Sequence, residues 1–228
     1  MKKKVFFIAA LAAAVFTTND VAAQTPEGGE KNIEVNFTPL GGAPISINNL
    51  RLRYFSSSDM AFRVGLSIVS NSSTDEEIVN AGTPTELTLE DKTSTFGLTI
   101  NPGIEFHFSQ TDRLSPYYGA EILFSTVSTT ETDQFEDPGN AGSSLESEVT
   151  NPNGTDGTTF GLNLILGADW YFSEHIYMGT EVGFGFSTTS FSDTESTPPA
   201  GSSVTTPNGS NFNLGPNFNS AIRLGFLF

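Results

Sequence analysis

The stretch FGLNLILGADWYF, residues 160–172, places most of its large apolar side chains on even-numbered positions, with polar residues such as Asn163 and Asp169 between them. A side-chain period of two is typical of a β-strand, whereas a helix repeats every 3.6 residues. Phe160 and Trp170 stand ten residues apart. At about 3.3 Å per residue and a tilt near 45°, this spacing spans about 23 Å along a membrane normal. The stretch therefore predicts a strand long enough to cross the apolar layer of a membrane.

The same alternation recurs along the chain and predicts eight strands in all. Side chains about fill the interior of an eight-stranded barrel. The apolar positions of the predicted strands number 37, which is too many to point inward, so we expect the apolar face to meet lipid. The opposite face is rich in Gly, Asn, Ser and Thr and suits a narrow polar lumen. We therefore expect an all-β fold, an eight-stranded antiparallel transmembrane β-barrel with up-and-down meander connectivity, whose strands include residues 33–37, 50–54, 62–69, 96–108, 117–125, 160–172, 176–186 and 212–228.

The connections between these predicted strands alternate in length. Short connections are expected near residues 55–60, 109–115 and 173–175, and a short first external loop at 41–48. Long polar loops are expected at 71–93, 127–157 and 187–210. In bacterial outer-membrane barrels the short turns are periplasmic and the long loops are extracellular. We therefore expect an outer-membrane location with both termini in the periplasm.

Aromatic residues on the apolar face are predicted to form two girdles, one at each membrane interface. The girdle near the short turns comprises Tyr54, Phe62, Phe106, Phe108, Tyr118, Trp170, Phe172, Phe226 and Phe228. The girdle near the long loops comprises Phe37, Phe96, Phe124, Phe160, Phe184, Phe186 and Phe212.

The N-terminus has the pattern of a secretory signal peptide. Residues 2–4 are lysines, residues 5–16 are apolar, and small residues precede a cleavage site after Ala23. A run of twelve apolar residues is shorter than the ~20 that a helix needs to cross a bilayer. We expect a signal peptide at 1–23, a short periplasmic N-terminal segment at 24–31 and the barrel at 32–228.

Composition excludes several functions. A formal net charge of −16 argues against a nucleic-acid partner, because the chain repels phosphate. The absence of cysteine excludes a disulfide scaffold, a thiolate metal site and a cysteine nucleophile. The two histidines, His107 and His175, fall at the short-turn end, away from the outer position where known barrel enzymes place a catalytic histidine. We therefore expect no enzymatic activity, no catalytic residues, no cofactor and no metal ligands.

The segment PYYGAE at residues 116–121 and the ending IRLGFLF at residues 222–228, together with the signal peptide and the alternating strands, resemble the small OmpA/OmpX-type outer-membrane β-barrel family. This resemblance implies a lipid bilayer and lipopolysaccharide as surroundings. It also implies that the barrel-assembly machinery reads the last strand, which carries over to Ile222, Leu224, Phe226 and Phe228. Nothing follows Phe228, so the peptidoglycan-binding domain of the two-domain relatives is not expected.

Charged residues on the predicted lumen face are the main candidate site. The favoured interpretation is a buried cluster of ion pairs that plugs the lumen, because unpaired charges there would be costly. The alternative is a gate whose pairs rearrange to admit small solutes. The residues concerned are Arg51, Arg53, Arg63, Arg223, Glu34, Glu105, Glu121, Asp169 and Glu181.

The predicted long loops carry 15 acidic residues and one basic residue, Lys92. Such a run usually forms a solvated surface, although oxygen ligands at Asp133, Glu136 and Asp137 suit Ca²⁺ or a binding partner. We expect a structural or surface-interaction role for the protein, as an accessory subunit of a larger outer-membrane assembly or with another surface partner. The alternative function is a narrow gated pore for ions or small solutes.

Overall fold

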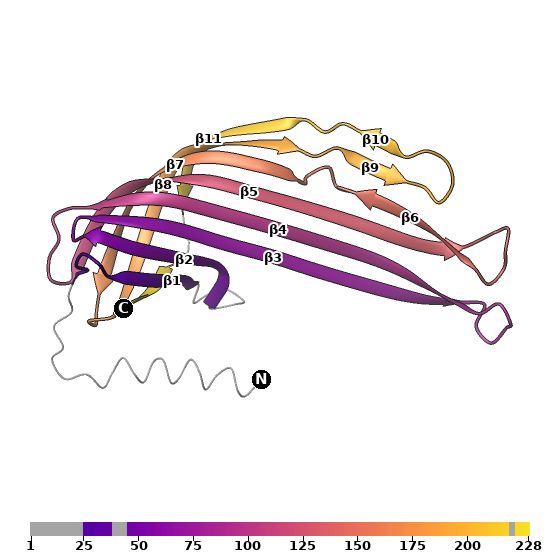
Figure 1. Cartoon of the computed structure of the whole chain (residues 1–228), viewed down its shortest axis with the longest axis horizontal. Coiled ribbons are helices and arrows are strands. Elements are labelled where there is room, and N and C mark those ends of the chain that lie inside the picture. Colours follow the sequence, from indigo (N-terminus) through magenta and orange to yellow (C-terminus); the bar gives the residue numbers. More distant parts are fainter. Residues whose placement is uncertain (1–24, 38–44, 219–221) are drawn as a thin grey trace.

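The computed structural model describes residues 25–37, 45–218 and 222–228, without the side chains of 37, 45–49, 217 and 218. The predicted signal peptide with its cleavage site at Ala23, and residues 41–44 of the predicted first loop, lie outside the described residues. Twelve strands in one antiparallel sheet make up the regular structure of the described part (Figure 1). Among the same residues, no helix has the length and apolar character needed to cross a membrane.

The strands differ widely in length. The longest adjoin one another in the sequence and form tall hairpins, and the shortest lie between them and the C-terminus. In chain order the strands are β1 (Lys31–Phe37), β2 (Ile45–Ser57), β3 (Met60–Val79), β4 (Leu87–His107), β5 (Leu114–Glu136), β6 (Ser144–Thr150), β7 (Gly157–Tyr171), β8 (Ile176–Phe191), β9 (Thr194–Thr197), β10 (Val204–Thr206), β11 (Ser210–Phe218) and β12 (Ile222–Leu227).

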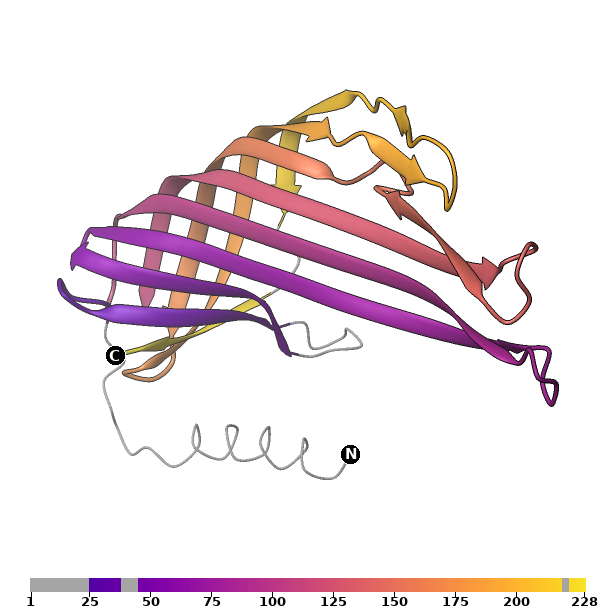
Figure 2. The same ribbon diagram turned by 45° about the vertical axis from the view of Figure 1, so that its right-hand side comes forward.

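The sheet closes on itself. Strands β1 to β5 pair in sequence order, β5 pairs with β7, and β7 pairs with β8. Strand β8 pairs with β11 and β12, and β12 returns to β1 in a register that runs from Asn32 opposite Leu227 to Phe37 opposite Ile222. The result is a ring of antiparallel strands (Figure 2). The predicted all-β antiparallel fold is confirmed; the described residues form twelve strands, so the expected count of eight is not confirmed.

The expected long loops account for most of this difference. Strands β3 and β4 continue in register to Val79 and Leu87, and β5 continues to Glu136 and pairs with β6, which pairs with β9 and then β10. The prediction of irregular loops at 71–93, 127–157 and 187–210 is therefore wrong. Both faces of these segments are hydrated, so polar residues occupy odd and even positions alike. The apolar alternation that marks a membrane strand is therefore missing, although Thr and Val favour strands.

One smaller boundary also differs from the prediction. Residues 45–48, expected in the first external loop, belong to β2. The last expected strand, 212–228, corresponds to β11 and β12, which both pair with β8, and residues 219–221 between them lie outside the described residues. In the connection between β3 and β4, residues 80–86, Asn80 and Gly82 adopt positive φ values of 53° and 76°, a conformation that Asn and Gly tolerate best.

The ring is apolar outside and polar inside. Leu164, Phe184 and Phe226 on its outer face are 60%, 53% and 47% exposed, whereas Glu105 and Asp169 inside are fully buried. This arrangement reverses that of a water-soluble barrel, and it matches a ring whose outer surface meets lipid.

A small apolar core lies inside the ring at the end where the short turns are. Its members are the terminal or near-terminal residues of their strands at that end. Tyr177 packs at 4.9 Å, centroid to centroid, against Tyr171. A Cβ on Gly225 would lie 2.1 Å from the Tyr177 ring, so only glycine leaves room for this side chain there. The core comprises Phe55, Ala61, Tyr171, Tyr177 and Leu227.

Candidate functional site: a charged cluster in the lumen

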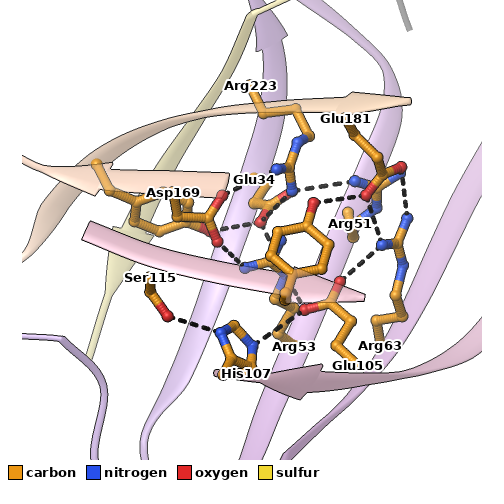
Figure 3. A network of polar contacts seen from close by, with 12 residues as sticks. Glu34, Arg51, Arg53, Arg63, Glu105, His107, Ser115, Asp169, Glu181 and Arg223 are labelled. Carbon is orange, nitrogen blue, oxygen red and sulfur yellow. Dashed lines mark hydrogen bonds and ion pairs between the residues drawn. The ribbon is translucent and has the colours of Figure 1, made fainter. Parts of the chain in front are cut away.

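The structure brings all nine predicted lumen charges together. Figure 3 labels all of them except Glu121. Each of β1, β3, β4, β5, β7, β8 and β12 contributes one residue, and β2 contributes two. The strand period of two explains the arrangement, because charged residues on inward positions of neighbouring strands meet across a narrow lumen. The cluster thus draws on every strand of the ring except β11.

Arg53 is at the centre of the half of the cluster that is nearest the apolar core. Its Nε lies 3.0 Å from Glu34 and 3.2 Å from Glu105, and its terminal nitrogen lies 2.5 Å from Asp169. Arg223 reaches two of the same carboxylates, Glu34 at 3.1 Å and Asp169 at 2.8 Å. Both arginine side chains are at most 1% exposed.

Arg63 links this half of the cluster to the half that contains Glu121 and Glu181. Its terminal nitrogens lie 2.6 Å from Glu105, 2.7 Å from Glu181 and 2.8 Å from Glu121. Arg51 makes longer contacts, 3.3 Å to Glu34 and 3.6 Å to Glu181, and its side chain is 11% exposed. Every arginine of the cluster therefore meets at least two carboxylates, which offsets the cost of burying its charge.

Neutral side chains complete the network. Tyr117 Oη donates to Glu181 at 2.7 Å, and Tyr177 Oη donates to Glu34 at 2.5 Å. The guanidinium of Arg53 lies 5.1 Å from the centre of the Tyr117 ring and 5.8 Å from that of Tyr177, within range of a cation–π interaction. No role was predicted for either tyrosine. The signal available for Tyr117 was its even spacing from the predicted lumen charge Glu121 on the same strand.

His107 joins the cluster from the end of β4. Its Nδ1 hydrogen-bonds to the Ser115 hydroxyl at 2.7 Å, and its Nε2 lies 3.5 Å from Glu105. All three side chains are at least 95% buried. His175 lies apart, in the turn before β8, with its ring 5.8 Å from that of Phe226. The buried position of His107 suits a structural role and leaves it no access to a substrate.

A polar cavity of about 390 Å³ lies on the other side of the cluster from the apolar core. Arg51, Glu121 and Glu181, the least buried members of the cluster, contribute to its lining. The rest of the lining includes Asn101 and Asn163, which lie farther along their strands from the short turns, and several glycines. The charged cluster therefore separates an apolar core at the short-turn end from a polar cavity toward the long strands.

Sequence comparison with known families matches residues 44–228, most of the chain, to the OmpA-OmpF-like porin family. The chain belongs to this family. The expected resemblance to OmpA-type outer-membrane barrels is thus confirmed, and the family is porin-like and not one of enzymes. A sequence search of curated proteins finds no match to this chain.

The solved structures similar to this porin-like barrel include OprG and CarO. The outer membrane protein OprG from Pseudomonas aeruginosa is 14% identical over 92% of this chain and 99% of its own, with a TM-score of 0.43. CarO from Acinetobacter baumannii is 12% identical over 90% of this chain and 98% of its own, with a TM-score of 0.31. Both TM-scores are below 0.5, so neither structure bears on the function of this chain.

The other predicted site residues of the porin-like barrel have different surroundings. Ile222, Phe226 and Phe228 of the predicted assembly signal are 41%, 47% and 61% exposed on the outer face, and Leu224 is half-buried. The predicted calcium ligands do not converge: Glu136 accepts a hydrogen bond from Asn80, and Asp137 accepts one from the backbone of Gly139. Within the described ranges, no group of His, Cys, Asp and Glu is arranged to hold a metal ion.

Proposed function

We propose that this protein is a barrel of the outer membrane whose lumen is closed, and that it acts as a structural or surface-interaction protein. The observation that carries the proposal is the double closure of the lumen. Nine charged residues pair across it, and an apolar core that includes Phe55, Tyr171 and Tyr177 fills its short-turn end. A solute crossing the barrel would have to break buried ion pairs and then displace this core, which is costly.

We assign the membrane-spanning part to the eight-strand circuit β1, β2, β3, β4, β5, β7, β8 and the last strand, with both termini in the periplasm. Exposed aromatic residues at two levels support this placement. At the short-turn end Tyr54 pairs with Phe62, and at the other end Phe124 pairs with Phe160, and all four are 42–48% exposed. Aromatic side chains of this kind gather at the two interfaces of a membrane barrel.

The barrel also has an exposed surface for binding beyond the second aromatic level. Strands β3 to β6, β9 and β10 extend there as a curved sheet that rises beyond the ring (Figure 1). The extension and its connecting turns carry 15 acidic residues, and all of them except Asp156 are exposed or half-buried. A hydrated sheet of this size suits recognition by a partner, such as another subunit of an outer-membrane assembly, and supplies no catalytic constellation, so we propose no enzymatic activity.

Insertion is proposed to follow the route of other outer-membrane barrels. The outward Ile222, Leu224, Phe226 and Phe228 would be read by the barrel-assembly machinery, and lipid with lipopolysaccharide would surround the apolar face. Removal of Phe228 should lower the amount of heat-modifiable barrel in outer membranes, whereas the amount of secreted chain stays the same. An unchanged amount of assembled barrel would contradict this role.

Liposome swelling tests the closed lumen. Proteoliposomes that contain the full chain should swell no faster in L-arabinose than liposomes without protein. A porin of known pore size in parallel liposomes provides the positive control. Swelling above the protein-free rate would overturn the proposal.

The cavity above the cluster favours one alternative, a narrow gated pore. Arg51 and Glu121 at the cavity are 11% and 12% exposed, so their ion pairs are the ones that water can reach. A gate of this kind predicts swelling or ion flux that increases when Arg51 or Glu121 is replaced by a neutral residue. Unchanged impermeability of these variants would exclude the gate.

A further inference from the structure

Strand β3 has a long unpaired edge above the ring. Strand β2 accompanies β3 only as far as the pair Leu50 and Leu66. Beyond this point β3 continues to Val79 with β4 as its sole strand partner in the described part of the chain. Residues 68–78 are all exposed, at both odd and even positions. The free edge forms one border of the sheet extension (Figure 2).

A free edge of this length can accept another strand. Every second residue of an edge strand directs its backbone N–H and C=O away from the sheet, and these groups form a template for an added strand. An extended peptide that adds to such an edge obtains affinity from main-chain hydrogen bonds and specificity from alternate side chains. The edge over residues 71–79 lies past Ser70, which pairs with Phe96 of the second aromatic level, so it stands clear of the lipid.

The edge is strongly negative on both faces of the sheet. Asp75, Glu76 and Glu77 are consecutive, so they alternate between the two faces. Asp75 stands directly opposite Asp91 on β4, and Glu76 stands opposite Glu90. Like charges in directly opposed positions destabilise a sheet. None of the three edge carboxylates makes an ion pair with any residue that the structure describes.

We propose that the edge of β3 over residues 71–79 is a docking site for a basic, extended segment of another protein. The segment adds as a strand and places Lys or Arg side chains next to Asp75, Glu76 and Glu77, where they relieve the repulsion between the opposed carboxylates. This inference deepens the surface-interaction role proposed above and rests on it.

A second copy of this chain does not fit the same site. Of its ten basic residues, residues 2–4 lie in the predicted signal peptide and four arginines belong to the lumen cluster. The remaining three, Lys31, Lys92 and Arg113, are far apart in the sequence. The chain therefore has no basic extended segment to offer, and a second acidic edge would be repelled. The partner is a different protein.

Fluorescence anisotropy with a labelled nonapeptide, TVTKKKTVT, tests the proposal on the full chain folded in detergent. The peptide reads the same in both directions, so parallel and antiparallel addition give the same side-chain order. At low ionic strength we expect saturable binding. The same peptide with an N-methyl group on every backbone amide keeps its side-chain charges but loses the main-chain donors of both edges, and its affinity should fall about tenfold or more.

Two protein variants locate the site. Replacement of Asp75→Asn, Glu76→Gln and Glu77→Gln together should weaken peptide binding about tenfold, since three exposed charge pairs are lost. The matched control Glu146→Gln, Glu148→Gln and Glu195→Gln removes three charges from β6 and β9 of the same extension, and should change the affinity less than about twofold. Circular dichroism verifies that both variants are folded.

Three results would overturn the docking site: no saturable binding, equal binding of the N-methylated peptide, or equal weakening by the two variants. The last two results would show that the acidic surface attracts cations without strand addition at this edge. Liposome swelling tests the closed lumen separately. Absence of peptide binding by an impermeable barrel therefore overturns the docking site alone.

Discussion

Replacement of Arg223 by methionine should destabilise the folded barrel by about 3 kcal/mol. The Arg223 side chain is 1% exposed and lies 3.1 Å from Glu34 and 2.8 Å from Asp169. Removal of one member of a buried ion pair leaves an uncompensated charge and costs about 3–5 kcal/mol. Because Arg53 still contacts both carboxylates, the lower end of that range applies.

Unfolding in urea, with the purified protein in detergent micelles, measures this loss, and heat-modifiable migration on gels separates folded from unfolded chains. The control Lys92→Met removes an exposed positive charge from β4 and should change stability by no more than about 0.5 kcal/mol. Arg223→Lys keeps the charge but loses the two-pronged geometry, and should fall between the two. Equal stability of Arg223→Met and Lys92→Met would refute the assignment of Arg223 to a buried network.

Three further predictions follow from the lumen and the outer face. Tyr177→Phe removes the hydroxyl that donates to buried Glu34 and should cost about 1.5–3 kcal/mol in the same urea assay; no loss would show that the bond is not formed. Gly225→Ala places a Cβ 2.1 Å from the Tyr177 ring and should destabilise the barrel by about 1–3 kcal/mol, whereas Gly209→Ala, with open space around it, should be tolerated; equal stability of the two variants would contradict the packing described. Trp170 is the only tryptophan and is 46% exposed on the outer face, so brominated lipids should quench its fluorescence, and emission unaffected by them would place it away from lipid.

The period of two made the membrane strands predictable, because a strand between lipid and a polar lumen must alternate. The same parity assigned Arg63 and Glu181 to one lumen. It could not show that these two residues pair, because they are 118 positions apart in the sequence and their contact depends on how the ring closes. Nor could it reveal the role of Tyr177, whose partner Glu34 lies across the closure between the first and last strands.

The sheet extension was hidden for a different reason. Strand pairing there, such as Asp75 opposite Asp91, continues a register already set in the membrane. Such a ladder needs no apolar face, since both faces are in water, so the residues carry no alternation to detect. Where a strand leaves the membrane, the hydropathy pattern ends but the backbone hydrogen bonds do not.

Planar-bilayer recording of the purified full-length barrel tests the closed lumen most directly. With the charged cluster and the apolar core both in place, the account predicts bilayers that contain the protein yet show no steady open-channel current in 1 M KCl. Insertion can be verified in the same preparation by heat-modifiable migration. A steady, reproducible conductance step from the unmodified protein would contradict the closed lumen.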